Sequence, residues 1–98
     1  MAVTVIVEFQ ATPEGVDDFA QGLHEALPDT RAREGNISVE ELRNQDDPCN
    51  FVVYQKWESR PLYEAYLNWR MESGMMDQIG PLLTGEPSVR FLDVVEPG

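Results

Sequence analysis

The sequence has 98 residues, of which 18 are acidic and 7 are basic, so its formal net charge at pH 7 is −11. This length fits one domain over residues 1–98, and the acidic balance argues against nucleic acid or anionic membranes as partners, because phosphate recognition needs clustered Lys and Arg. Cys49 is the only cysteine and His24 the only histidine, which excludes a disulfide within the chain and a structural zinc site with its usual four ligands.

The first third of the chain predicts a strand followed by a helix. Over residues 2–10, apolar and mostly polar residues alternate and β-branched side chains are frequent, as in a strand. Thr12, followed by Pro and Glu, is typical of a helix start. An apolar stripe continues the helix, with His24 expected to face solvent. Pro28 is expected to kink or interrupt this helix, and Gly35 to end it.

The middle of the chain predicts two strands joined by a hairpin loop. Residues 37–43 alternate poorly around Glu40 and Glu41, which indicates a bulge or an exposed edge strand. Residues 44–50 are dense in turn formers. Residues 51–57 read FVVYQKW and are largely apolar on both faces, so we expect a central strand that is buried on two sides.

The last part of the chain predicts further helices and a final strand. Ser59 is a plausible N-cap for a helix that continues to about Arg70. The apolar residues of 75–83 belong to a short second helical segment. Residues 88–96, SVRFLDVVE, are expected to form the last strand.

These elements follow the order β-α-β-β-α-β, which indicates a ferredoxin-like α+β fold with a four-stranded antiparallel sheet. Helices would cover one face, and the other face would carry apolar side chains such as Ile6, Val52 and Tyr54. Such a patch exceeds what monomers usually leave exposed, and a chain this short is near the size at which one core is barely sufficient. We therefore expect a homodimer with its two sheets packed face to face, a dimeric α+β barrel.

The N-terminal residues and the lone cysteine bear on the compartment. The segment MAVTVIVEF has no basic region and no long apolar run, so neither a signal peptide nor a membrane span is expected. A single free cysteine fits a reducing compartment. The expected location is the cytoplasm.

Several short segments resemble the antibiotic biosynthesis monooxygenase family: FVVYQKWES at 51–59, EAYL at 64–67 and GPLL at 80–83. Residues 13–15 and 34–35 also match, at a helix start and at a glycine before the second strand. The resemblance spans nearly the whole chain. It implies a dimeric α+β barrel with a pocket between sheet and helices. It also implies a cofactor-independent monooxygenase that uses dioxygen to oxidise a small aromatic phenol or hydroquinone to a quinone.

Two positions depart from the family pattern. Many members have a histidine where Tyr66 stands, and some types rely on an asparagine in the first strand, which this chain lacks. The resemblance implies that Trp57 lines the pocket and donates to a substrate oxygen. It makes Tyr66 a hydrogen-bond donor in place of the histidine, although a tyrosine is a poor base at neutral pH.

The candidate catalytic residues are therefore Trp57 and Tyr66. Further side chains are candidates for binding substrate, because they can stack on a flat ring, adapt to its shape, orient a carbonyl or stabilise an oxyanion. They are Gln55, Tyr63, Arg70, Met75, Met76 and Phe91. Two alternatives stay open: aromatic rows at helix and strand spacing also form ordinary cores, and Arg70 also fits a surface salt bridge. The sequence has no metal-ligand cluster, Gly-rich phosphate loop or nucleophilic triad, so neither a metal nor a cofactor is expected.

Three functions compete at this point. The first is the cofactor-independent monooxygenase, which is physically possible because a deprotonated, electron-rich phenol can itself reduce dioxygen by one electron. The protein then supplies a dry pocket, orientation and donors for the developing oxyanion. The second is a non-catalytic small-ligand binding or cyclase-like helper protein, which the missing His and Asn favour. The third, heme degradation, usually needs an axial histidine where Tyr66 stands.

Overall fold

The computed structural model describes residues 2–97, and the two ends of the expected domain, Met1 and Gly98, lie outside the described residues. The elements follow in the predicted order. They are β1 (Val3–Gln10), α1 (Val16–Ala32), β2 (Asn36–Arg43), β3 (Asn50–Trp57), α2 (Arg60–Glu72), α3 (Met75–Ile79), the 3-10 helix η1 (Gly80–Leu82) and β4 (Ser88–Leu92).

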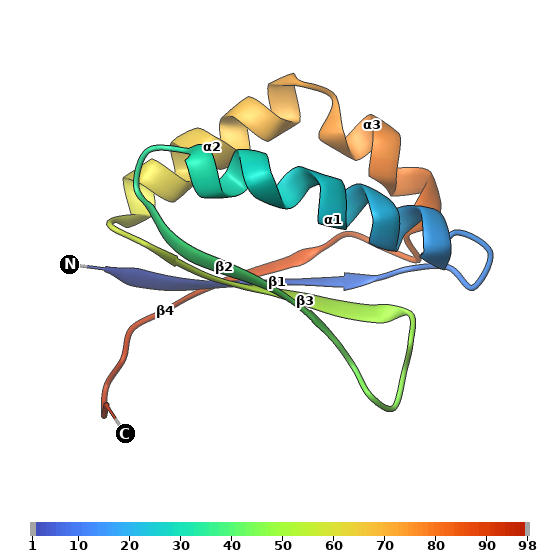
Figure 1. The fold of residues 1–98 in the computed structure, drawn as a ribbon, viewed down its shortest axis with the longest axis horizontal. Coiled ribbons are helices and arrows are strands. Elements are labelled where there is room, and N and C mark those ends of the chain that lie inside the picture. Colours follow the sequence, from blue (N-terminus) through green and yellow to red (C-terminus); the bar gives the residue numbers. More distant parts are fainter. Residues whose placement is uncertain (1, 98) are drawn as a thin grey trace.

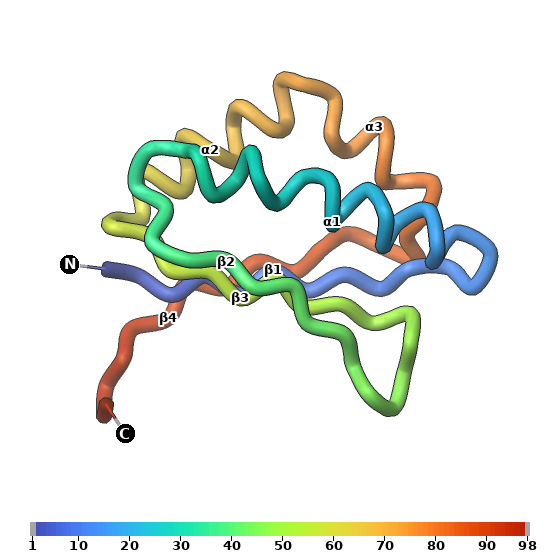
Figure 2. The backbone as a smooth tube through the Cα atoms, viewed as in Figure 1, coloured from blue at the N-terminus to red at the C-terminus, as the bar shows by residue number. Residues whose placement is uncertain are grey.

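The strands form one antiparallel sheet in the order β2-β3-β1-β4. The two central strands are β1 and β3, and Val5 lies opposite Gln55 on one side and Phe91 on the other. Helices α1, α2 and α3 cover the same face of the sheet and leave the other face bare (Figures 1 and 2). This arrangement confirms the predicted ferredoxin-like α+β fold and the central position of β3.

The core lies between the helices and the sheet. The alternation in β1 turns its valines and Phe9 toward the helices, where they are buried. Phe19 of α1 packs between the rings of Phe9 and Phe51, with centroid distances of 5.1 and 5.3 Å. Burying one such side chain stabilises the fold by roughly 1.5–3 kcal/mol, so this aromatic group anchors α1 on the two central strands.

Helix α1 differs from its prediction at its start and at Pro28. The amide of Gly15 donates to the side-chain oxygen of Thr12 at 2.9 Å, which closes a turn and delays the first helical residue to Val16. The helix then runs through Pro28 to Ala32 without interruption. A proline removes only one helical hydrogen bond, here to the carbonyl of His24. Both residues are exposed, so water can bond that carbonyl.

The edge strands β2 and β4 also depart from the predicted pattern. The irregularity of β2 lies between Asn36 and Ser38, where the register shifts, and not at Glu40 and Glu41. Strand β4 ends at Leu92 and not at residue 96, because its neighbour β1 begins at Val3, one residue beyond the Thr4–Leu92 pair. The edge position expected for β2 is confirmed.

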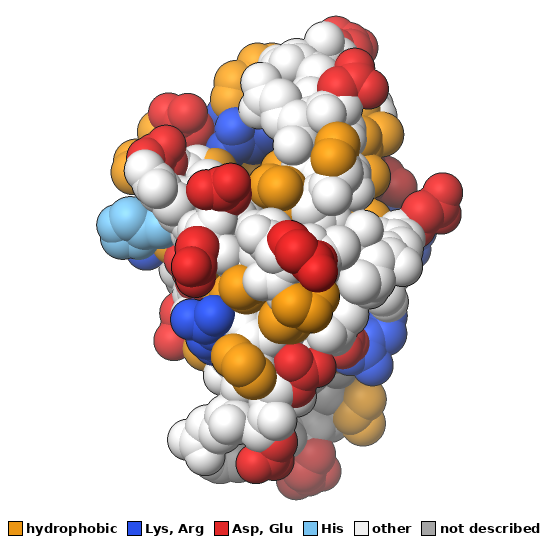
Figure 3. All heavy atoms as spheres, turned by 90° about the vertical axis from the view of Figure 1, so that its right-hand side faces the viewer, with side chains coloured by type: hydrophobic (Ala, Val, Ile, Leu, Met, Phe, Trp, Pro, Cys, Tyr) orange, Lys and Arg blue, Asp and Glu red, His pale blue; other side chains and the backbone are white. Residues whose placement is uncertain are grey.

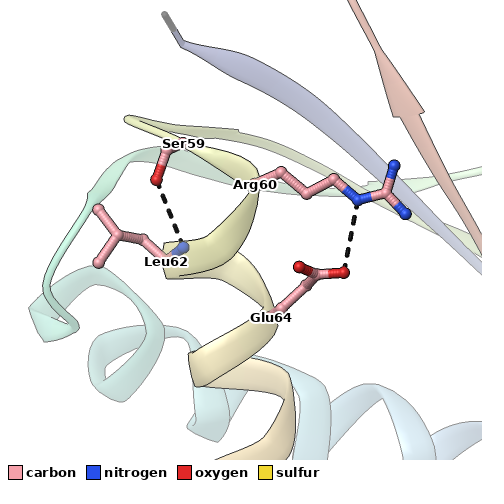
Figure 4. A network of polar contacts seen from close by, with 4 residues as sticks. All are labelled: Ser59, Arg60, Leu62 and Glu64. Carbon is pink, nitrogen blue, oxygen red and sulfur yellow. Dashed lines mark hydrogen bonds and ion pairs between the residues drawn. The ribbon is translucent and has the colours of Figure 1, made fainter.

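Helix α2 begins at the predicted serine cap. The Ser59 side chain accepts from the Leu62 amide at 3.4 Å, and Arg60 pairs with Glu64 at 3.4 Å along the first turn (Figure 4). Gly35, which has a φ of 91°, packs against this turn, since a Cβ there would lie 2.7 Å from the Cβ of Leu62. The α1–β2 turn and the start of α2 therefore depend on each other.

The sheet face opposite the helices is partly apolar. Leu42 and Leu92 are 44% and 43% exposed, and Ile6, Val52 and Tyr54 are half-buried on the same face. On the side of the molecule that Figure 3 shows, acidic side chains are spread out with hydrophobic side chains between them. Within residues 2–97, the structure contains no helix of the length and apolar character that a membrane crossing requires.

Candidate functional site

A cavity of about 620 Å³ lies between the three α-helices and the helix-facing side of β1 and β3. Most of its lining side chains are apolar, among them Phe9, Leu27, Leu67 and Ile79. The volume falls in the range of about 300–1,000 Å³ that is typical of small-molecule sites. The cavity is therefore suited to a small and largely apolar ligand.

Eight polar side chains line this largely apolar space, and three of them, Ser73, Gln78 and Glu86, follow helix α2 in the chain. Helix α1 contributes Thr30, β3 contributes Gln55, and α2 contributes Tyr63, Tyr66 and Arg70. The three residues on α2 are spaced by three and four positions, which places them on one helix face.

Tyr66, Thr30 and Arg70 form a hydrogen-bonded group, here called the Tyr66 network, that joins α2 to α1. The Tyr66 hydroxyl lies 2.8 Å from Thr30 Oγ1 and accepts from Arg70 Nε at 3.0 Å. One terminal nitrogen of Arg70 donates to the Ala26 carbonyl at 2.9 Å and to the Thr30 hydroxyl at 3.3 Å. Thr30 also reaches the Ala26 carbonyl, at 3.2 Å.

The hydroxyl protons of this network have two consistent arrangements. When Thr30 donates to Ala26, Tyr66 donates to Thr30 and keeps no proton for a ligand. When Thr30 donates to Tyr66, the phenol oxygen accepts from Thr30 and Arg70, and its own proton is free for a ligand. Rotating two hydroxyl groups interconverts the arrangements. Tyr66 can thus present or withhold a donor without any heavy atom moving.

Arg70 supplies positive charge to the cavity wall. Within residues 2–97 no carboxylate lies within 4 Å of its guanidinium, since Arg60 and Glu64 form the one ion pair there. The guanidinium instead stacks over the rings of Trp69 and Tyr66, 4.7 and 5.3 Å from their centroids. The surface salt bridge considered for Arg70 is absent from this part of the chain, and the unpaired charge favours a ligand with an anionic oxygen.

Trp57 lies behind Gln55 and not on the cavity wall. It is 0% exposed, and its indole Nε1 donates to Gln55 Oε1 at 2.9 Å. Its ring packs against those of Tyr63 and Tyr66, at 5.6 and 5.1 Å. An indole has a single donor, so Trp57 has no N–H left for a ligand. The structure therefore does not place Trp57 on the cavity lining, where the family resemblance implied that it would lie.

Tyr63 and Phe91 form a second aromatic layer. The pKa of the Tyr63 phenol is raised above its usual value, mainly by burial and further by the negative charge of an ionised Tyr66 nearby. Phe91 packs edge-on against Tyr63 at 5.6 Å and has the guanidinium of Arg60 3.8 Å above its ring. Phe91 supports Tyr63 from outside the cavity lining.

The methionines enter the cavity because a glycine, Gly74, separates α2 from α3. Gly74 adopts a left-handed conformation, with a φ of 85°, and redirects the chain into α3. Met75 and Met76 follow directly and line the cavity. Their flexible thioether side chains can adapt to the outline of a ring.

Six of the predicted site residues thus line one cavity: Gln55, Tyr63, Tyr66, Arg70, Met75 and Met76. Their chemical roles stay predictions. The sequence interpretation missed Thr30, since it follows Pro28 in a stretch that offered no functional pattern. The signal that could have found it is its spacing of three from Leu27, which places it on the inward stripe of α1.

The histidine lies outside the cavity lining. His24 is exposed on α1, as expected. Within residues 2–97, no three His, Cys, Asp or Glu side chains are grouped so that they could hold a metal ion. The polar groups of the cavity lining are two hydroxyls, two phenols, two amides, one guanidinium and the carboxylate of Glu86.

Comparison with protein families identifies one match. The model of the family described as "Antibiotic biosynthesis monooxygenase" covers residues 2–71, which span β1 to all but the last residue of α2. No curated protein is significantly similar to the chain.

Solved structures resemble the chain over nearly its whole length. A protein from Mycobacterium tuberculosis is 25% identical, with a TM-score of 0.80 and coverage of 99% of this chain and 98% of the other. A structure titled antibiotic biosynthesis monooxygenase is 20% identical, with a TM-score of 0.86 and coverage of 96% and 99%. A protein of unknown function from Nitrosomonas europaea is 22% identical, with a TM-score of 0.84 and coverage of 99% and 92%.

Proposed function

The chain belongs to the antibiotic biosynthesis monooxygenase family, and we propose that it oxidises an aromatic phenol or hydroquinone to a quinone with dioxygen and without a cofactor. The observation that carries this proposal is the apolar cavity of about 620 Å³ with a guanidinium and two phenols in its wall. Such a space can accept an aromatic ring, and its polar groups can stabilise an oxyanion on that ring.

The proposed reaction needs no further reductant. A hydroquinone gives two electrons and two protons to one dioxygen, which yields a quinone and hydrogen peroxide. A phenol with a free para position and one dioxygen give a para-quinone and one water. The phenol loses its O–H proton, and the phenolate transfers one electron to dioxygen. Superoxide then joins the ring radical at the para carbon and, with one proton, forms a hydroperoxide. Its O–O bond breaks as the para C–H proton leaves, which releases water and forms the second carbonyl.

The cavity residues divide this work between charge and position. Arg70 holds the phenolate oxygen through the terminal nitrogen that the Tyr66 network leaves unused. Tyr66 donates to or accepts from the same oxygen according to the arrangement of its network. Tyr63, Met75 and Met76 pack against the ring. Removing one donor to a developing oxyanion lowers kcat by about 10²–10³-fold. Substitution of Arg70 is therefore the most direct test of the proposal.

Oxygen uptake with a hydroxylated anthrone tests this function, because an anthrone and dioxygen give an anthraquinone and water. We expect uptake above the uncatalysed rate, and a loss of about 10²-fold in kcat for Arg70→Met. Arg60→Met is the matched control, since Arg60 also stacks on an aromatic ring but is 57% exposed and outside the cavity. Equal rates for wild type and Arg70→Met across a panel of anthrones and hydroquinones would remove the basis of the proposal.

A second candidate function is non-catalytic binding of a small ligand, or a cyclase-like helper role. It is favoured by the absence of any histidine from the cavity lining, since His24 is exposed, and by the raised pKa of Tyr63, which makes that phenol a weak acid. A ligand that raises the melting temperature and is recovered unchanged under oxygen would support this role.

We also propose that the chain acts in the cytoplasm as a homodimer. The partly apolar sheet face that carries Ile6, Leu42, Val52, Tyr54 and Leu92 supports this assembly. A second copy packed on that face would bury it, as in the dimeric α+β barrel that the family resemblance implies.

A further inference from the structure

The amide of Gln55 is held in one orientation by its neighbour on the same strand. Gln55 Oε1 accepts from Trp57 Nε1 at 2.9 Å. An indole nitrogen is a donor only, so the oxygen of the amide must face it. The orientation of this amide, which is often ambiguous in a structure, is settled here by chemistry.

The other end of the amide is open to the cavity. Gln55 is 4% exposed and is one of the lining residues. Every fully buried side-chain nitrogen or oxygen within residues 2–97 has a hydrogen-bond partner. Gln55 Nε2 has no hydrogen-bond partner within residues 2–97, so this nitrogen is not fully buried. We infer that it is exposed to the cavity.

We propose that Trp57 is a positioning residue that makes the floor of the cavity a hydrogen-bond donor and so selects ligands with an acceptor, a carbonyl or phenolate oxygen, at that point. Trp57 touches no ligand and acts only through Gln55. The proposal rests on the proposed function only for the choice of a flat aromatic ligand. Arg70 is also a donor, so the cavity recognises oxygen atoms from two sides.

Two neutral fluorescent probes of matching shape test this selection. Anthracene-9-carbaldehyde carries an acceptor, and 9-aminoanthracene carries a donor at the same position. We expect wild type to bind the aldehyde about tenfold more tightly relative to the amine, which is what one neutral hydrogen bond is worth. Equilibrium binding consumes no oxygen, so this result is independent of whether the protein oxidises phenols.

Two substitutions separate positioning from simple support. Trp57→Phe frees the amide to turn its oxygen to the cavity. The ratio of aldehyde affinity to amine affinity then falls to near one, because the amine gains affinity. Gln55→Met removes the amide at nearly constant size, so the ratio of the two affinities also falls, but because the aldehyde binds more weakly. A damaged cavity would weaken both probes and could not improve binding of the amine.

Trp69→Phe is the matched control for Trp57→Phe. It changes the other tryptophan, which lies outside the cavity lining, and is expected to keep the wild-type ratio of the two affinities. Trp57→Phe with an unchanged preference would show that Trp57 does not set the amide. An unchanged preference in Gln55→Met, or failure of both probes to bind wild type, would also overturn the inference.

Discussion

Replacing Tyr66 by phenylalanine removes one oxygen atom from the contact between α1 and α2. That oxygen contacts Thr30 at 2.8 Å and accepts from Arg70 at 3.0 Å. Both partners keep another bond, since Arg70 still reaches Ala26 at 2.9 Å and Thr30 reaches the same carbonyl at 3.2 Å. The loss should therefore fall between that of a neutral and that of a charged hydrogen bond, at about 1.5 kcal/mol of unfolding free energy.

Urea unfolding followed by circular dichroism measures this difference in unfolding free energy. Thermal unfolding gives a second measurement, because a domain of this size loses roughly 4–8 °C of melting temperature per kcal/mol. Tyr66→Phe should therefore melt about 6–12 °C lower than wild type. Protomer concentration is kept equal, because dimer formation would shift apparent stability. Tyr63→Phe is the matched control, one turn earlier on α2. Its hydroxyl has no hydrogen-bond partner within residues 2–97, so we expect a change below about 0.5 kcal/mol.

The comparison of Tyr66→Phe with Tyr63→Phe shows whether the Tyr66 network stabilises the contact between α1 and α2. If Tyr66→Phe and Tyr63→Phe lose the same unfolding free energy, the Tyr66 network does not hold α2 against α1. A double-mutant cycle between Tyr66→Phe and Thr30→Val then isolates the pair itself, and a coupling of about 0.5–1.5 kcal/mol is expected.

Two further predictions concern alkaline pH and assembly. The raised pKa of Tyr63 means that the folded state holds this proton more tightly than the unfolded chain, so its contribution to stability is complete below the ordinary tyrosine pKa near ~10 and is lost as pH rises above it. The unfolding free energy of wild type should fall above that pH, Tyr63→Phe should fall less, and an equal decline in both would contradict the assignment. Tyr54→Glu places a charge on the bare sheet face and should yield monomers by light scattering, whereas Ala65→Glu, on the exposed side of α2, should not. A wild type that is monomeric at micromolar concentration would refute the dimer.

The fold was largely predictable because most of its strands and helices have a clear local sequence pattern. The two-sided apolar pattern of residues 51–57 identified the central strand, and the serine cap located the start of α2. The start of α1 was predicted too early because Thr12 and Pro13 suit a turn as well as a helix cap. Only the contact between Gly15 and Thr12 shows which one forms.

The candidate site was partly predictable for a related reason. Gln55 stands out as a polar residue on an otherwise apolar strand face, and periodicity places Tyr63, Tyr66 and Arg70 on one side of α2. Periodicity assigns a face but not a depth. It therefore could not distinguish Gln55, which borders the cavity, from Trp57, which shares its face and lies behind it. Nor could it pair Thr30 with Tyr66, which are 36 positions apart.

Gly35 has a consequence for how sequences with this backbone can diverge. Its positive φ disfavours every other residue type, and a Cβ on this backbone would lie 2.7 Å from the Cβ of Leu62, so that one of the two segments would have to shift. The two constraints are independent, so a change at Leu62 could relieve only the second. Among chains that retain this helix-to-strand geometry while sharing about a fifth of their residues, this position should be among the slowest to vary.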